Sequence, residues 1–119
     1  MISVILSSAL TLAAYQATIN APRTAFVGCL KAAGAKAEGA KVTVENFRAF
    51  IAGECAAQAG ALKSALVSFD VKNGIKRAAA ESDAVLQLDD YYLNAKEKYQ
   101  SKTTPKAVQA AQPTQGSQP

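Results

Sequence analysis

Cys29 and Cys55 are the residues of this 119-residue chain whose chemistry depends most on where the fold places them. They are 26 positions apart, unlike the CxxC spacing of redox-active pairs, and no basic residue is arranged to lower either thiol pKa. Two interpretations are open: a structural disulfide, or two reduced thiols packed as small apolar side chains. The sequence favours the disulfide. Closing a loop of about 26 residues would stabilise the fold by about 3–4 kcal/mol.

Catalytic, nucleotide and metal signatures are missing from the sequence. There is no His, and the acidic residues form no cluster at ligand spacing, so neither a metal site nor a cofactor is expected. Asp89 and Asp90 are adjacent, but neighbours on a helix diverge by about 100° and cannot face each other as a general acid and base. The GxGxxG, GxxxxGK and GxSxG patterns do not occur. The sequence therefore predicts a protein without enzymatic activity.

Two polar residues interrupt the apolar stripes of the expected helices. Gln58 lies 15 residues before Asn73, and Asp89 lies 16 residues after it. An antiparallel hairpin turning at Asn73 would bring the two side chains level. We therefore expect Gln58 and Asp89 to form a buried polar pair that fixes the register of the hairpin.

The composition defines the size and class of the protein. The chain is 50% hydrophobic and 18% charged, enough for one small domain whose core must pack through Ala and Gly. Its formal net charge is +4, but the basic residues are dispersed and no Arg/Lys cluster alternates with aromatic residues. Nucleic acid is therefore not expected as a partner.

Residues 1–17 are apolar and uncharged, which is typical of a secretory signal peptide. The apolar run is about 14 residues, too short to span a bilayer. Cleavage near Ala13 or Ala17 would release a periplasmic or secreted protein, although no Lys or Arg follows Met1. The alternatives are a retained membrane anchor and the first helix of a cytosolic bundle.

The patterning predicts an all-α fold with three helices in residues 18–100. The first runs from Asn20 to Ala37, the central one from Thr43 to Asp70, and the third from Ile75 to Tyr99. Thr43 is a cap residue, and Gly39 and Gly74 suit helix ends. The two longer helices should form an antiparallel hairpin within a small three-helix bundle.

The central helix is apolar on two sides, so we expect both to be covered, either by other parts of its own chain or by another chain. Its larger side chains form one stripe: Val44, Phe47, Ile51, Cys55, Leu62, Leu66 and Phe69. Gly53 and Gly60 lie on the other side. They indicate either a close crossing with another helix or glycines that a well-packed hairpin simply tolerates. The expected interface residues are Ala49, Gly53, Ala56, Gly60, Val67 and Tyr91.

The third helix is amphipathic, and the chain beyond it changes in character. The predicted apolar face consists of Ile75, Ala78, Ala79, Ser82, Val85, Leu86, Tyr92 and Leu93. Residues 101–119 are rich in Gln, Pro, Ser and Thr and are predicted to be disordered, because they cannot bury enough apolar surface to order the chain.

These features favour an exported structural or protein-interaction module, with either an unknown protein or a second copy as partner. A second hypothesis is a membrane-surface or lipid-binding helical protein that uses a groove between its helices or a retained N-terminal segment. Membrane contact is expected only if that segment is retained. A third hypothesis is a cytosolic basic binding protein with an intact N-terminus and reduced thiols.

Overall fold

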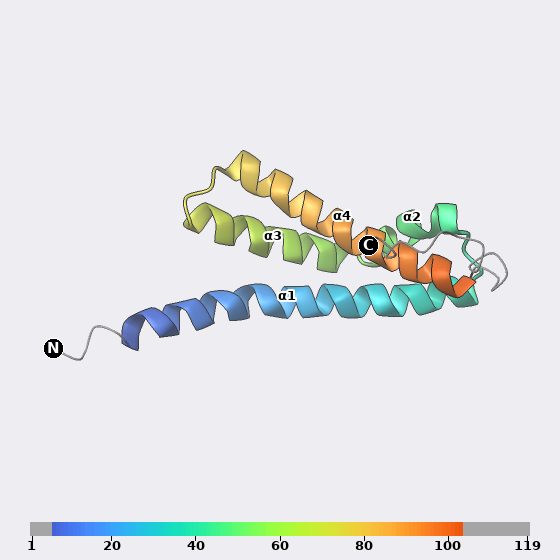
Figure 1. Ribbon diagram of the computed structural model, residues 1–119, viewed down its shortest axis with the longest axis horizontal. Coiled ribbons are helices and arrows are strands. Elements are labelled where there is room, and N and C mark those ends of the chain that lie inside the picture. The colour runs from blue at the N-terminus through green and yellow to red at the C-terminus, as the bar shows by residue number, and fades with distance from the viewer. Residues whose placement is uncertain (1–5, 104–119) are drawn as a thin grey trace, which may run out of the picture.

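The computed structural model describes residues 6–103, with side chains from residue 18 onward, and is an all-α bundle. Its four helices are α1 (Leu6–Gly39), α2 (Val44–Glu54), α3 (Ala56–Lys72) and α4 (Arg77–Thr103) (Figure 1). The predicted fold class is confirmed, with four helices in place of three. Most of the predicted tail lies outside the described residues, but α4 continues through residues 101–103.

The first helix is much longer than predicted. It begins at Leu6 instead of near Asn20, and Pro22 lies inside it. Proline lacks an amide hydrogen and therefore removes one backbone hydrogen bond, yet the helix continues on both sides. The residues upstream include Leu10, Leu12 and four alanines, which are strong helix formers, and no Pro or Gly lies among them. The expected boundary at residue 17 is thus not a break in secondary structure.

The central helix is interrupted at Cys55, which corrects the prediction of one helix over 43–70. Cys55 has φ −111° and ψ 21°, outside the helical range, and separates α2 from α3. Its amide still donates to the Ile51 carbonyl at 3.0 Å. The start of α2 agrees with the prediction, because the Thr43 hydroxyl accepts a hydrogen bond from the Asn46 amide at 3.3 Å.

Helices α3 and α4 form an antiparallel hairpin, and α1 lies along both of them (Figure 1). The hairpin turns at Gly74, whose φ of 91° is the left-handed conformation predicted for it. The Ile75 amide donates to the Asp70 carbonyl at 3.0 Å, and the Gly74 amide donates to the Val71 carbonyl at 3.1 Å. This pair of bonds is the Schellman motif, which satisfies the last carbonyls of α3.

The end of α1 uses the same motif with a different residue. The Val42 amide donates to the Ala37 carbonyl at 3.0 Å, and the Lys41 amide donates to the Glu38 carbonyl at 3.2 Å. Lys41 occupies the left-handed position with φ 54°. A residue with a Cβ is strained there, so this helix end stores a cost that glycine would avoid.

All four helices contribute to one apolar core, and no polar or charged residue is buried in the described part of the chain. The aromatic residues organise it. Phe26 packs edge to face against Tyr91 and Tyr92, with ring centroids 5.5 and 5.7 Å apart. The buried residues are Phe26, Leu30, Ala33, Ala37, Phe47, Ile51, Cys55, Ala59, Leu62, Leu66, Val67, Ala80, Ala84, Leu88, Tyr92 and Tyr99.

The buried face of α4 differs from the predicted one. Ile75, Val85, Leu86 and Leu93 were expected in the core, but they are 43, 42, 60 and 52% exposed. The helix instead buries a stripe of Ala and Tyr residues together with Leu88. Small alanines allow a close helix approach, while the tyrosines reach further into the bundle. Of the predicted apolar face, only Tyr92 is buried.

Candidate functional site

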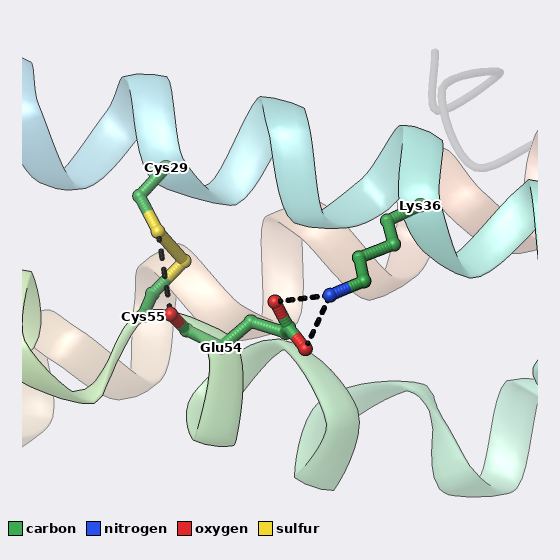
Figure 2. Close-up of polar contacts among 4 residues, drawn as sticks. All are labelled: Cys29, Lys36, Glu54 and Cys55. Carbon is green, nitrogen blue, oxygen red and sulfur yellow. Dashed lines mark hydrogen bonds and ion pairs between the residues drawn. A yellow bond between two sulfur atoms is a disulfide. The ribbon is translucent and has the colours of Figure 1, made fainter.

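A disulfide joins α1 to the junction of α2 and α3. The sulfur atoms of Cys29 and Cys55 are 2.12 Å apart, with the Cα atoms at 5.8 Å, as the disulfide interpretation predicts. Figure 2 shows Glu54 next to Cys55, with its carboxylate pointing toward Lys36 farther along α1. The Lys36 ammonium lies 3.0 Å from both carboxylate oxygens of Glu54. The backbone carbonyl of Glu54 also lies 3.8 Å from the Cys29 sulfur. The disulfide and the ion pair therefore both connect α1 to the C-terminal end of α2.

The predicted pairing of Gln58 with Asp89 is wrong. Asp89 forms an ion pair with Arg48 of α2, and its side chain is 43% exposed. Gln58 is only partly buried. Counting residues from the turn placed the two side chains at the same height, but could not show that α2 would supply a basic partner for the carboxylate. The pair does not fix the register of the hairpin.

Tyr92 lies beside this ion pair and has a perturbed acidity. The Arg48 guanidinium carbon is 5.3 Å from the centroid of the Tyr92 ring, within cation–π range. Burial raises the pKa of the Tyr92 hydroxyl, the Arg48 charge opposes that rise, and the Asp89 charge adds to it. The hydroxyl therefore stays protonated at neutral pH.

The predicted interface residues are divided between surface and core. Ala49, Gly53, Ala56 and Gly60 are exposed, whereas Val67 is buried and Tyr91 is partly buried. A Cβ added at Gly53 or Gly60 would meet no atom within 4 Å, so neither glycine permits a close crossing within this chain. The chain itself therefore leaves most of the small-residue side of the central segment uncovered, and cover by another chain stays a prediction.

The outward face of α4 carries large apolar side chains. Leu86 and Leu93 are seven residues apart and follow Ala79 by the same interval. This spacing places the three residues along one line on the side away from the buried Ala84 and Leu88. All three are exposed in this chain. We call this line the α4 outer stripe.

A groove of about 750 Å³ lies between α1 and α4 on the other side of that helix. Most of its lining surface is apolar, although polar and apolar side chains contribute in equal number, and Gly34 lines it without a side chain. Charged residues from both helices stand around the apolar ones. The lining residues are Val27, Leu30, Lys31, Gly34, Ala35, Glu38, Phe47, Tyr91, Asn94, Ala95, Glu97, Lys98, Tyr99, Ser101 and Lys102.

The charges around the groove are only partly paired. Lys102 lies 3.7 Å from Glu38 and joins the two walls near the C-terminal ends of α1 and α4. Lys31 of α1 and Lys98 of α4 line opposite walls. Among the described residues, neither has a carboxylate within ion-pair distance. The groove therefore combines apolar surface with two ammonium groups available to a ligand.

Sequence reasoning allowed for a groove between helices in the second hypothesis but did not identify its lining residues, although their pattern is present. Leu30 and Gly34 are four residues apart on α1, as are Tyr91 and Ala95 on α4. These intervals place each pair on one helix face, but the faces become a groove only when α1 and α4 lie side by side. Tyr91 was predicted as an interface residue, so its place in the lining of this groove was not foreseen.

The described part of the chain contains no group of three or more His, Cys, Asp or Glu residues that could hold a metal ion. None of the helices within residues 6–103 has the length and hydropathy needed to cross a bilayer. Comparison with protein families, curated proteins and solved structures found no match to this chain.

Proposed function

We propose that this protein is an exported helical module that associates with another protein, in the first instance a second copy of itself, through the α4 outer stripe. The proposal combines two features of different origin. The apolar N-terminal sequence and the Cys29–Cys55 bridge favour an oxidising compartment. The exposed leucines favour a protein contact.

The observation that carries the proposed contact is the exposure of Leu86 and Leu93, at 60 and 52%. Their seven-residue spacing with Ala79 is that of a helix–helix seam. Such a line is self-complementary in an antiparallel pair, because the residues at its two ends exchange places across a twofold axis. A second copy is therefore the partner that this surface fits most directly.

Sedimentation velocity of the oxidised protein tests the association. We expect a concentration-dependent dimer, and we expect Leu86→Lys with Leu93→Lys to give a monomer of unchanged helicity. Ser64→Lys with Ser68→Lys is the matched control, since it adds the same charge on exposed positions of α3. A wild-type protein that stays monomeric at high concentration would contradict self-association.

Intact mass under non-reducing conditions, with and without a thiol-blocking reagent, tests the compartment. A protein purified from its natural source should lack residues 1–13 or 1–17 and should not react with the reagent. An intact N-terminus with two reactive thiols would favour the cytosolic hypothesis and exclude export. An intact N-terminus with a closed disulfide would favour a retained anchor.

A further inference from the structure

We propose that the groove between α1 and α4 binds a single-chain anionic amphiphile, with its alkyl chain on the groove floor and its acidic head group between Lys31 and Lys98. This inference goes beyond the proposed protein association and uses a different surface. The α4 outer stripe points away from α1, whereas the groove faces it.

The floor of the groove suits an alkyl chain. The buried side chains of Leu30, Phe47 and Tyr99 form its base. Val27, which is 39% exposed, continues the apolar surface along α1. Small-molecule sites are typically apolar clefts of about 300–1,000 Å³, and the 750 Å³ of this groove falls within that range. The floor residues themselves are buried, and the apolar lining that still contacts water includes the exposed Val27 and the partly buried Tyr91 and Ala95.

Open space lies beside Gly34 in the groove. A Cβ added at Gly34 would meet no atom within 4 Å, although the residue lines the groove. The walls on either side are fixed by other contacts. The Tyr99 hydroxyl donates to the carbonyls of Ala37 and Val42, and the Phe47 ring stacks on Tyr99 at 4.1 Å. The groove is therefore a preformed feature of the packed helices.

The charges select an anionic head group. Lys31 and Lys98 approach from opposite walls, while the third lysine, Lys102, is already 3.7 Å from Glu38. Both side chains can keep their ammonium groups in water while their methylene stems extend the apolar wall. Glu97 also lines the groove, so a cationic head group would meet two ammonium groups against one carboxylate.

The contact across one end of the groove favours a small amphiphile over a partner helix. The ion pair between Glu38 and Lys102 links α1 to α4 at the C-terminal end of the groove. A helix docked along the groove would have to pass this link. An alkyl chain can instead end before it.

Calorimetric titration of the full chain with decanoate, dodecanoate and tetradecanoate, below their micelle concentrations, tests the proposal. Each pair of added methylenes should raise affinity about three- to tenfold, as expected for partial burial of the chain. Dodecyl maltoside and dodecyltrimethylammonium carry neutral and cationic head groups and should bind at least tenfold more weakly than dodecanoate. Equal binding of all three head groups, or no binding of any, would overturn the proposal.

Two sets of variants locate the site. Gly34→Leu should reduce dodecanoate affinity at least tenfold by filling the groove. Gly28→Leu should leave it unchanged, because Gly28 is an exposed residue of the same helix outside the groove. Lys31→Gln with Lys98→Gln should abolish the preference for the anionic head group while keeping the fold. Wild-type binding by Gly34→Leu, or an unchanged preference in the lysine variant, would contradict the assignment.

Discussion

Tyr99 shows how one side chain can close one end of this bundle. Its ring stacks on Phe47 at 4.1 Å with an interplanar angle of 12°. Its hydroxyl reaches the carbonyl oxygens of Ala37, at 3.3 Å, and of Val42. These carbonyls belong to the end of α1 and the connection that follows it, so α4 is attached to both α1 and α2 through this residue.

Tyr99→Phe tests the hydroxyl separately from the ring. The substitution leaves the stacking surface in place but removes the donor from a buried position, so the free energy of unfolding should fall by about 1–2 kcal/mol. Urea denaturation monitored by circular dichroism would measure the change. Tyr91→Phe is the comparison, since no hydrogen bond of the Tyr91 hydroxyl supports the helix end. Equal losses in the two variants would show that the contacts to Ala37 and Val42 contribute nothing.

Lys41→Gly should stabilise the protein. Lys41 has φ 54°, and glycine adopts this conformation without the steric cost of a Cβ. We expect a gain of about 0.5–1 kcal/mol in the free energy of unfolding, measured by thermal or urea denaturation. Gly74→Ala provides the opposite case, because Gly74 has φ 91°, and it should destabilise by at least a similar amount. A loss of stability in Lys41→Gly would mean that the lysine side chain supports the helix end.

The raised pKa of Tyr92 predicts how the stability of the fold changes at alkaline pH. Burial raises the pKa of its hydroxyl in the folded state, so folding favours the protonated form. This contribution to stability is fully present below the unfolded pKa of about 10 and is lost as the pH rises through the higher folded value. Tyr92→Phe should therefore reduce the fall in stability above about pH 10, measured by urea denaturation across that range. An unchanged alkaline slope would contradict the prediction.

At the scale of helices, the sequence was sufficient to predict the helix ends that depend on the chemistry of a single residue. The caps at Thr43 and Gly74 follow from residue type, because a hydroxyl can satisfy an amide and glycine can adopt positive φ. The break at Cys55 could not be predicted in this way, since neither proline nor glycine occupies the position. The buried face of α4 was mispredicted because the large aliphatic residues Leu86 and Leu93 were expected in the core. The helix instead packs through alanines, Leu88 and two tyrosines, which contact Phe26 of α1 and Phe47 of α2.

Of the candidate sites, the disulfide could be predicted from the sequence and the ion pair of Asp89 could not. The Cys29–Cys55 bridge could be predicted because two cysteines near a short helix connection allow few arrangements. The partner of Asp89 could not, because the prediction treated α2 and α3 as one straight helix. The interruption at Cys55 lets α2 take its own direction, and Arg48 then reaches the carboxylate.

Removing the disulfide should weaken the attachment of α1 to the α2–α3 junction. Cys29→Ala with Cys55→Ala should lower the free energy of unfolding by about 3–4 kcal/mol, since the bridge restricts a loop of 26 residues in the unfolded chain. Urea denaturation of both proteins, with and without reductant, measures the effect. The reductant should bring the wild type to the stability of the variant and leave the variant unchanged. Coincident denaturation curves for the oxidised wild type and the variant would show that the disulfide does not contribute to the free energy of unfolding.

Considered as a whole, the molecule depends on apolar burial and one crosslink, because its charged contacts are all at the surface. The three ion pairs in the described part connect α1 with α2, α2 with α4, and α1 with α4. Their side chains are between 35 and 70% exposed, so each contributes about 1 kcal/mol or less. The core is correspondingly small, and it is built around Phe26, Phe47, Ile51 and Leu62.

The position of α1 in the whole molecule predicts that residues 1–17 can be removed without loss of the fold. Its N-terminal turns extend farther out than the loop joining α3 to α4 (Figure 1). Among the described side chains, Ile19 is the first to contact the core and Phe26 the first to be buried. A chain starting at Thr18 should therefore form the same disulfide and unfold within about 1 kcal/mol of the full chain, as measured by urea denaturation. A large loss of stability would show that the N-terminal turns support the bundle, which is incompatible with their cleavage as a signal peptide.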